Sequence, residues 1–416
     1  MALRRLSGGT SRDRLPSGAG LLAALILAVA PGCSWARPEA PVAEAAVNEG
    51  GVRRTVLVRG LEHPWGLAWL PAGDLLITER PGRLRLVRQG VLDPRPIAGL
   101  PPLLAMGQGG LLDVAVHPRF ARNQLVYLTF SAGEAQANQT RLVRARLVDH
   151  RLEDLTLLYA VTPLKPGSQH FGSRLLWLPD GTLLLSVGDG GNPPIELEGQ
   201  AIRLKAQSKA SGLGKVLRLN DDGSIPADNP FRSDPDADPA LWSLGHRNIQ
   251  GLAHDPLQGR IWSSEHGARS GDELNLLVAA GNYGWPAVSH SREYSGPEIT
   301  PLRSAPGFVD PRLVWTPAIA PSGLAVGSGR AVAAWKGNLF AGGLVSRDVR
   351  RIELGPGGEV LRQSVLPVGQ RVRDVREGPD GHLHVLTDGA GDGALIRLEP
   401  AESALPTLPT GLRQTR

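Results

Sequence analysis

Residues 66–71 (GLAWLP) lead through a turn into residues 75–78 (LLIT), and this short phrase decides the fold because the chain repeats it. Each copy joins a small residue and an apolar pair to a turn at proline or glycine, and then to an apolar strand. Five further copies follow at 113–118 (DVAVHP) with 125–128, 175–181 (LLWLPDG) with 183–186, 251–256 (GLAHDP) with 261–264, 323–326 (GLAV) with 339–341, and 374–379 (DVREGP) with 383–387. A recurring hairpin cannot bury its own faces, whereas copies stacked around an axis bury one another. The repeat therefore predicts a β-propeller.

The rest of the sequence is typical of an all-β protein. Its 416 residues include 52 glycines and 35 prolines, which are scattered as turn residues between short apolar runs. Six copies of the phrase predict a six-bladed β-propeller of four-stranded antiparallel blades. Residues 52–58 and 394–398 also have strand character. We therefore expect the N- and C-terminal strands to pair in the last blade, which leaves no long exposed edge.

Long insertions adjoin the phrases near Pro118, Pro179 and Pro256. They are rich in glycine, proline, aspartate and asparagine. In a propeller such insertions sit on one face and usually build the site. We therefore expect a functional site at one end of the propeller axis.

The N-terminus has the features of an export signal. Four early arginines precede residues 21–30 (LLAALILAVA), which are too few to span a membrane as a normal helix, and Cys33 follows. This pattern resembles a bacterial lipoprotein signal, in which the cysteine is lipidated. Pro31 leaves ordinary signal-peptide cleavage open, and a retained anchor is the third alternative. In each case we expect the folded domain outside the cytoplasm, in the periplasm or outer envelope, with membrane contact only through such an anchor.

The expected organisation along the chain has four parts. These are a signal peptide at 1–33, a flexible linker at 34–51, a propeller catalytic domain at 52–399 and a disordered tail at 400–416. Cys33 is the single cysteine, so intramolecular disulfides are excluded.

Several functional classes lack support in this sequence. The formal net charge of +5 comes without a run of basic residues interleaved with aromatics, so we expect no nucleic-acid partner. Residues 212–215 (GLGK) lack the full phosphate-loop spacing, and no helical pattern follows residues 188–191 (GDGG), so neither is a nucleotide-binding fingerprint. A zinc-binding HExxH helix and a serine nucleophile elbow are also absent from the sequence.

The polar residues that remain lie at the start of the repeated phrases or just after their strands. They are Gln108, His170, Arg247, Asn248, Glu265, His266, Gly267, Asp272, Glu273, Arg371 and Arg373. Because these groups enter each blade's first strand at the same end, and inner strands line the channel of a propeller, we expect them to converge on one axial pocket. We interpret five histidines as structural (His246, His254, His266, His382 and His384), and Trp69, Trp177 and Trp262 as core.

The chemistry of this set is coherent. Arg247, Arg371 and Arg373 offer bidentate recognition of carboxylates or phosphates. His170 is a candidate general base near neutral pH. Glycine carbonyls and carboxylates are hard oxygen ligands suited to calcium. Purely structural alternatives stay open. His170 can be a hydrogen-bonded structural histidine, Arg371 and Arg373 can form a solvated face, and the pair at 272–273 can solvate a loop.

These residues and motifs resemble the soluble quinoprotein aldose sugar dehydrogenases of the glucose/sorbosone dehydrogenase family. The resemblance covers roughly residues 52–399. It rests on the ordered motifs GQGGLLDVAVHPRF (107–120), HFGSRL (170–175), GKVLRLNDDGSIPADNPF (214–231), LGHRNIQGLA (244–253), SEHGARSGDELN (264–275), GNYGWP (281–286), APSGLAV (320–326) and RVRDVREGPDG (371–381). The family fold is a six-bladed propeller, in agreement with the count of the phrases.

The resemblance implies a cofactor, a metal and roles for single residues. The cofactor is pyrroloquinoline quinone (PQQ), and the metal is Ca²⁺. His170 matches the catalytic base of the family. The cofactor-binding positions correspond to Gln108, Arg247, Asn248, Arg371 and Arg373, with Tyr294 as a further candidate. Main-chain carbonyls of Gly267 and Ala268 match the ligands of the calcium that touches PQQ, and Glu273 and the Tyr283 carbonyl match a second, structural calcium.

The sequence departs from the family pattern at two informative positions. Val345 stands where members often have a lysine that reaches the cofactor, so either Arg347 replaces it or the contact is lost. Gln169 stands where the soluble glucose dehydrogenases have an aspartate beside the histidine, which places this chain nearer the broad-specificity aldose branch.

The expected activity is therefore oxidation of aldose sugars at C1 to lactones, by hydride transfer to the quinone. The partners are a small aldose substrate and an electron acceptor that the sequence does not identify. Two alternatives remain: a non-catalytic propeller that has lost the cofactor, and a calcium-dependent lactonase on the same fold.

Overall fold

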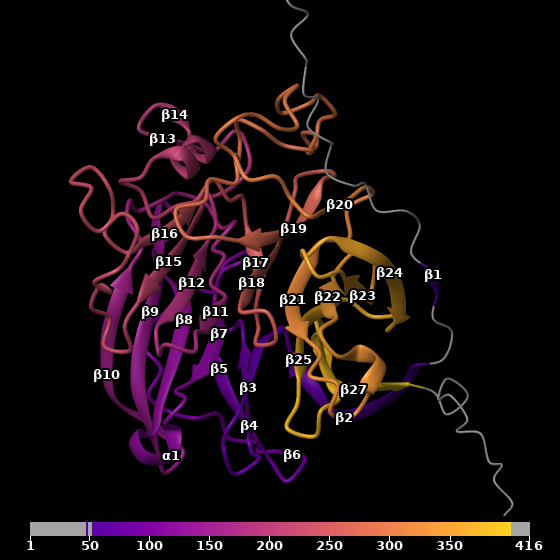
Figure 1. Cartoon of the computed structure of the whole chain (residues 1–416). Helices are drawn as coiled ribbons and strands as arrows, with labels where there is room; N and C mark the ends of the chain where they lie inside the picture. Colours follow the sequence, from indigo (N-terminus) through magenta and orange to yellow (C-terminus); the bar gives the residue numbers. More distant parts are fainter. Residues whose placement is uncertain (1–46, 49–51, 401–416) are drawn as a thin grey trace, which may run out of the picture. The chain divides into compact units, whose positions relative to one another are not determined.

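The computed structural model describes residues 47–48 and 52–400, and these residues form a six-bladed β-propeller (Figure 1). The predicted signal peptide, Cys33, nearly all of the linker and nearly all of the tail lie outside the described residues. Within the described ranges no helix is long and apolar enough to cross a membrane. The predicted fold class is confirmed.

The first three blades follow the chain in order, each as a four-stranded antiparallel sheet. Blade 1 contains β3 (Pro64–Trp69), β4 (Leu75–Glu79), β5 (Arg83–Arg88) and β6 (Val91–Leu92). Blade 2 contains β7 (Leu111–Val116), β8 (Leu125–Glu134), β9 (Ala137–Val148) and β10 (Arg151–Ala160). Blade 3 contains β11 (Leu175–Trp177), β12 (Leu183–Val187), β15 (Lys215–Leu219) and β16 (Leu241–Leu244).

The other three blades complete the ring. Blade 4 contains β17 (Ile249–Asp255), β18 (Arg260–Glu265), β19 (Asp272–Leu277) and β20 (Leu313–Trp315). Blade 5 contains β21 (Pro321–Val326), β22 (Leu339–Gly343), β23 (Asp348–Leu354) and β24 (Val360–Pro367), with the short β1 (Val47–Asn48) added in parallel to β24. Blade 6 contains β25 (Val372–Glu377), β26 (Leu383–Thr387), β27 (Ala390–Pro400) and β2 (Val52–Glu62).

Few other elements interrupt the described strands. They are the one-turn helix α1 (Phe120–Asn123), the 3₁₀ helices η1 (Ile202–Gln207) and η2 (Ala333–Trp335), and the small hairpin of β13 (Glu196–Leu197) and β14 (Gln200–Ala201).

Blade 6 closes the ring by joining the two ends of the domain. Strand β2 pairs antiparallel with β27, from Val52 opposite Pro400 to Glu62 opposite Ala390. Its Val58 and Leu61 pack in one apolar cluster with residues of blade 1 and blade 6. The predicted pairing of the terminal strands is therefore confirmed, and β2 forms the outer edge of blade 6.

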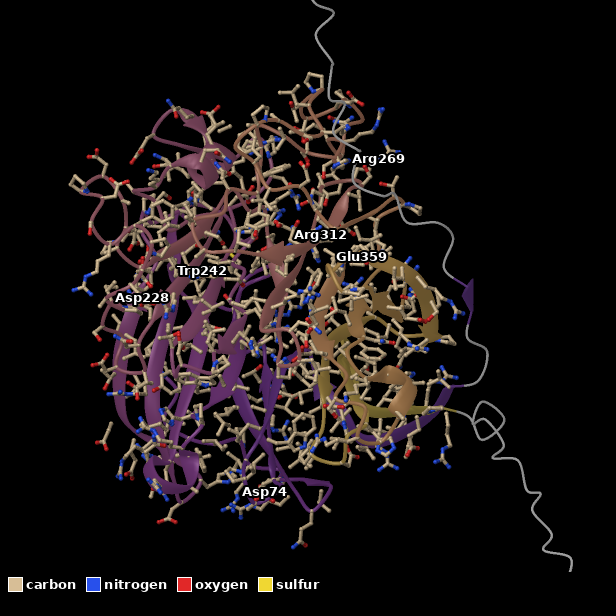
Figure 2. All side chains as sticks on the ribbon, viewed as in Figure 1. Asp74, Asp228, Trp242, Arg269, Arg312 and Glu359 are labelled. Atoms are coloured by element: carbon tan, nitrogen blue, oxygen red, sulfur yellow. The ribbon has the colours of Figure 1, made fainter. Side chains whose placement is uncertain are left out.

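The repeated phrases are the inner strands of the blades. The inner strands of successive blades are neighbours around the axis, in the order β3, β7, β11, β17, β21, β25 and back to β3. Each inner strand runs from the same end of the axis to the other. Figure 2 distinguishes these ends: Arg269 lies at the end where the inner strands begin, and Asp74 lies in a turn at the opposite end.

The long insertions do not all lie at one end. Residues 188–214 emerge near the starts of the inner strands and contribute Asp189 to the site described below. Residues 278–312 leave β19 at the opposite end, where Leu277 pairs with Ile261, and they return alongside β16 to contribute Trp285. Residues 220–240 depart from the expectation, because β15 ends at Leu219 at the opposite end; there the Asp221 carbonyl accepts a hydrogen bond from the Tyr127 hydroxyl. Insertion length alone therefore does not locate the site.

Truncation of Leu61 is expected to destabilise the propeller because it weakens the packing of β2, the strand by which blade 6 joins the two ends of the domain. Its side chain is fully buried between blades 6 and 1. Leu61→Ala should lower the free energy of unfolding by about 2–5 kcal/mol, the usual cost of a buried leucine truncation. Arg59→Ala changes an exposed residue of the same strand and should stay within about 0.5 kcal/mol of wild type. Urea unfolding of both variants measures the difference, and equal midpoints would contradict the role of β2.

Candidate active site

An axial pocket of about 220 Å³ opens at the end where the inner strands begin. Residues from all six blades line it: Trp65, Arg80, Gln108, Leu112, Phe171, Gly172, Asn248, Gln250, His266, Ala320, Leu344, Arg371, Arg373 and Asp388. Four of the predicted cofactor-binding residues, Gln108, Asn248, Arg371 and Arg373, are among them. Side chains that are far apart in sequence, from Trp65 to Asp388, thus meet in one cavity.

His170 is held beside this pocket by groups from three segments. Its backbone N–H donates to Gln108 Oε1 at 2.9 Å, and its Nδ1 lies 2.6 Å from Asp189 Oδ1. The other oxygen of Asp189 accepts a hydrogen bond from Trp285 Nε1 at 2.7 Å. Because the Asp189 carboxylate can only accept, Nδ1 carries the proton and Nε2 is left as the basic nitrogen.

The protonation states of this pair follow from its burial. Both side chains are almost inaccessible to solvent. Burial lowers the pKa of His170, and the nearby Arg247 adds to this effect, against the opposite influence of Asp189. Burial acts to raise the pKa of Asp189, but the His170, Arg247 and Trp285 interactions outweigh it and leave this pKa below its ordinary value. A neutral imidazole oriented by a carboxylate is the arrangement that a general base requires.

Asp189 was missed by the sequence analysis. Residues 188–191 were considered only as a nucleotide-binding fingerprint and set aside. A useful signal was present, because the aspartate directly follows an apolar strand at the end where His170 precedes one. Gln169, next to His170 in sequence, accepts hydrogen bonds from the backbone and side chain of Asn192.

Arg247 lies between the histidine and the loop after β18. Its Nη1 donates to the carbonyls of His266 (3.0 Å) and Gly267, and its Nη2 donates to Asn192 Oδ1 at 2.6 Å. Its buried Nε has no hydrogen-bond partner among the described residues. A buried guanidinium with an unused donor is a favourable place for an anionic or carbonyl oxygen of a ligand.

Arg371, Arg373 and Arg80 form the cationic side of the pocket. Arg373 Nη1 donates to Gln250 Oε1 at 3.2 Å, and its buried Nε has no hydrogen-bond partner within the described chain. Burial lowers the pKa of Arg373 to about 10, although Asp388 acts in the opposite direction. Arg371 Nε donates to Asp388 Oδ2 at 3.4 Å. Three arginines face one aspartate here, so the pocket has an excess of positive charge.

Arg80 was not predicted as a site residue from the sequence. It is a candidate to replace the lysine that the sequence analysis expected at the position of Val345. Val345 and Arg347 are both exposed and neither lines the pocket. Arg80 does line it, with Nη1 donating to the Gly107 carbonyl at 2.6 Å. The third cationic side chain of the pocket therefore comes from blade 1, which the sequence analysis did not consider.

The predicted metal ligands lie near one another, beside the pocket. The Gly267 carbonyl faces the Arg247 guanidinium, and the Ala268 backbone N–H donates to Ser291 Oγ at 3.1 Å. Glu273 and Tyr283 line a separate cavity of about 10 Å³ together with Glu265, room for one water-sized species. Burial raises the pKa of Glu273 well above its ordinary value, and the charge of Glu265 adds to this. Among the described residues no three His, Cys, Asp or Glu side chains form a metal-binding group.

The structure also places Tyr294 and His266, and their roles stay predictions. Tyr294 is 60% exposed and lines neither cavity. His266 was interpreted as structural, yet it lines the axial pocket, with Nε2 2.7 Å from the Pro321 carbonyl. Burial, with Arg247 and Arg373 nearby, lowers the pKa of His266 to about 3.

Comparison with known proteins identifies the family. A sequence model described as "Glucose / Sorbosone dehydrogenase" matches residues 61–397. The chain belongs to the glucose/sorbosone dehydrogenase family. It is 56% identical to the Synechocystis sp. protein slr1608 (85% of this chain, 87% of the relative) and 36% identical to the aldose sugar dehydrogenase YliI of Escherichia coli (83% and 92%).

A solved structure extends the comparison to the cofactor. The PQQ-bound form of aldose sugar dehydrogenase from Streptomyces coelicolor superposes with a TM-score of 0.69 at 29% identity, over 85% of this chain and 99% of that one. The resemblance to PQQ-dependent soluble aldose sugar dehydrogenases is thereby confirmed, and family membership supports a sugar dehydrogenase activity. The roles of the single residues stay predictions.

The partly buried His266 of this family member should make the apoprotein sensitive to mild acid. The unfolded chain takes up a proton below a pKa of about 6.5, whereas folded His266 does not until pH 3 is approached, so stability is lost as the pH falls. Between pH 7.5 and 5 this histidine alone should cost about 2 kcal/mol. His266→Gln should lose about that much less than wild type over the same interval. Urea unfolding at both pH values provides the measurement, and an unchanged pH dependence would contradict the assignment.

Proposed function

We propose that this protein oxidises aldose sugars at C1 to lactones, with PQQ as its cofactor, Ca²⁺ as its metal and His170 as the general base. The single observation that carries the proposal is the place of the His170–Asp189 pair and Arg247 directly beside the axial pocket that Arg371 and Arg373 line. His170 is bonded to the pocket residue Gln108, and Arg247 to the pocket residue His266. The relatives named as aldose sugar dehydrogenases and the PQQ-bound neighbour support the same conclusion.

The donor set suits PQQ, which carries three carboxylates and an ortho-quinone. Arg80, Arg371 and Arg373 would hold carboxylates by charge-assisted hydrogen bonds. The buried Nε groups of Arg373 and Arg247 have no partner in the described part of the chain, so a ligand oxygen would satisfy a donor that is otherwise costly to bury. When bound, the quinone supplies the oxidant, which accepts the hydride from C1 of the sugar.

His170 would remove the proton from the anomeric hydroxyl through Nε2, while Asp189 holds Nδ1–H and stabilises the imidazolium that forms. The lowered pKa of His170 keeps the imidazole neutral, with Nε2 unprotonated, at neutral pH. Arg247 would stabilise negative charge that develops beside it, a contribution of about 3 kcal/mol for one well-placed donor. Asn248 and Gln108 position the backbone of the segment that carries His170.

Calcium would be held by main-chain carbonyls and buried carboxylates. Beside PQQ, the ligands would be the carbonyls of Gly267 and Ala268, which requires the Arg247 guanidinium to release the Gly267 oxygen. The second site would use Glu273 and the Tyr283 carbonyl, which line the small cavity, and burial there raises the pKa of Glu273, so a cation would stabilise its charged form. Hard oxygen ligands of this kind are those that Ca²⁺ prefers.

Reconstitution tests the proposal and separates it from its alternatives. The purified protein would be loaded with PQQ and Ca²⁺ and supplied with aldoses and an electron-accepting dye. We expect dye reduction and lactone formation that both depend on PQQ. A non-catalytic propeller would give neither, and a lactonase would open lactones without an acceptor. Either result would overturn the proposal.

Removal of the base should separate binding from turnover. His170→Ala should bind PQQ with nearly unchanged affinity but reduce kcat by roughly 10²–10⁴-fold, the usual contribution of a general base. His150→Ala, in the turn between β9 and β10, is the control and should retain wild-type turnover. Full activity of PQQ-loaded His170→Ala would exclude this base.

Arg80 rather than Arg347 should replace the missing lysine. Arg80→Gln removes a cation that lines the pocket, whereas Arg347→Gln removes an exposed one outside it. Loss of a charge-assisted contact should weaken PQQ binding at least about tenfold in Arg80→Gln, and Arg347→Gln should bind like wild type. Titration of PQQ absorbance at fixed Ca²⁺ gives both affinities, and the reverse order would restore Arg347 to the role.

For the cellular context, we propose export to the periplasm or outer envelope, as expected from the N-terminal sequence, and a partner that re-oxidises the cofactor.

A further inference from the structure

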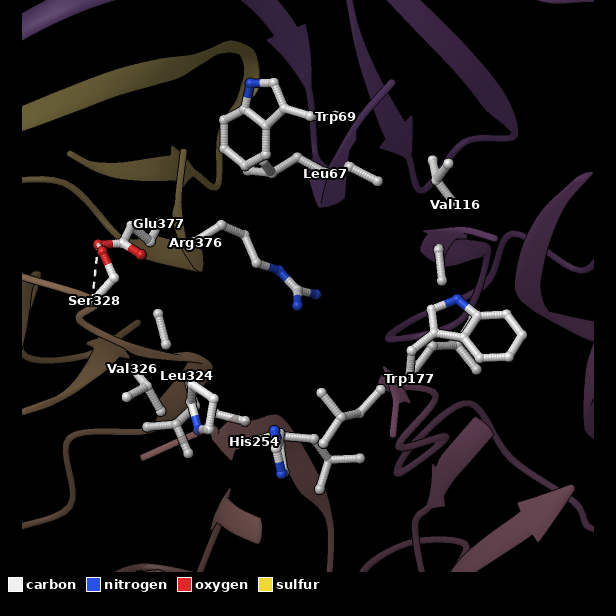
Figure 3. Close-up of a pocket in the computed structure, with 18 of the residues that line it drawn as sticks. Leu67, Trp69, Val116, Trp177, His254, Leu324, Val326, Ser328, Arg376 and Glu377 are labelled. Carbon is white, nitrogen blue, oxygen red and sulfur yellow. Dashed lines mark hydrogen bonds between the residues drawn. The ribbon is translucent and has the colours of Figure 1, made fainter. Parts of the chain in front are cut away.

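A second cavity lies on the axis at the end opposite the candidate active site. It has a volume of about 540 Å³, within the usual range for small-molecule sites. All six inner strands contribute to it (Figure 3). Its wall is mostly apolar, with Trp69, Trp177 and Leu324 among the side chains around the opening.

The repeat explains why the channel is open at this level. One equivalent position of the inner strands lines the cavity in all six blades; it is the third residue of each phrase except in blade 3, where it is the second. In four blades this residue is alanine: Ala68, Ala115, Ala253 and Ala325. The fifth is Leu176, and the sixth is Arg376. Small side chains leave space on the axis, and blade 6 places a single long cation in that space.

Arg376 presents its guanidinium to the middle of the cavity (Figure 3). Its Nε donates to Asp374 Oδ2 at 3.1 Å, and its Nη2 lies 3.5 Å from Asp113 Oδ1. No described residue accepts a hydrogen bond from its Nη1, and 22% of the side chain is exposed. The guanidinium is thus fixed on one side by carboxylates and has donors available on the other.

The other charged residue of this cavity is already engaged. Glu377 Oε1 accepts hydrogen bonds from the backbone N–H and hydroxyl of Ser328, at 2.9 and 2.7 Å, and its second oxygen lies 3.8 Å from Arg330. Arg376 is therefore the group that would select a ligand by charge, and the aromatic and aliphatic wall would select an apolar body.

We propose that this cavity binds a small organic carboxylate with an aromatic or aliphatic body, its carboxylate paired with Arg376 and its body against Trp69 and Trp177. The site is separate from the axial pocket of the proposed reaction, because the buried side chains of Arg174, Asp113 and Asp374 lie between the two and are ion-paired with one another. Binding does not depend on PQQ or on the proposed function.

Calorimetric titration with 2-naphthylacetate tests the site, with neutral 2-naphthylacetamide as the matched ligand. The carboxylate should bind wild type at least about tenfold more tightly than the amide, as expected for a charge-assisted contact. Arg376→Gln should remove this preference. Arg122→Gln, an exposed arginine of α1, should keep it. Equal affinity of the two ligands, or no binding at millimolar concentration, would overturn the proposal.

Two further measurements test whether 2-naphthylacetate binds in this cavity and not elsewhere. Ala68→Phe fills the cavity without changing its charge, so it should weaken binding of 2-naphthylacetate while Arg376 remains, and it serves if Arg376→Gln does not fold. PQQ-loaded protein should bind 2-naphthylacetate with the affinity of the apoprotein. Competition between the two ligands would mean that the carboxylate occupies the axial pocket instead, and would refute a separate site.

Discussion

The buried ion cluster on the propeller axis is the interaction on which both cavities depend. Arg174 of blade 3 lies 3.2 Å from Asp113 of blade 2 and 3.1 Å from Asp374 of blade 6, and all three side chains are almost completely buried. Arg174 Nε also donates to the Gln250 carbonyl of blade 4 at 2.8 Å. Four blades are thereby tied together where the channel would otherwise be continuous. Loss of one partner would leave an uncompensated buried charge, which is strongly destabilising.

The cluster also explains the residue that begins each phrase. In blade order this position holds Gly66, Asp113, Arg174 (which directly precedes the blade 3 phrase), Gly251, Gly323 and Asp374. A side chain at Gly66 would collide with the Asp113 carboxylate, and one at Gly323 would collide with that of Asp374. Glycine is required there because a charged side chain of the next blade occupies the space. The repeat therefore keeps its apolar positions from blade to blade, whereas the residue at this axial position varies between glycine and charged residues.

The sequence predicts the six blades and their apolar strands well, because each blade buries the same apolar positions of a local hairpin. It predicts the approximate end at which His170 and the arginines gather, because they all precede inner strands. It does not reveal Asp189 or Arg80, because both follow a second strand and reach the axis only through the register of their blades. Nor does the sequence predict that the Tyr294 side chain is exposed, because its position depends on the path of a long connection. Side-chain convergence across blades is a property of the closed ring and not of any local segment.

The closed ring also buries arginines at the candidate active site, which lowers the stability of the free protein, and a bound ligand can offset this loss. Arg247 and Arg373 are buried with unused Nε donors, and burial lowers the pKa of Arg373. Such groups destabilise the free protein, since a buried donor without a partner loses its hydration and gains nothing in return. An anion that binds only the folded state recovers this free energy and stabilises the fold by mass action. Affinity for an anionic cofactor and stability of the ring thus have a common origin in the closure of six blades around uncompensated arginines.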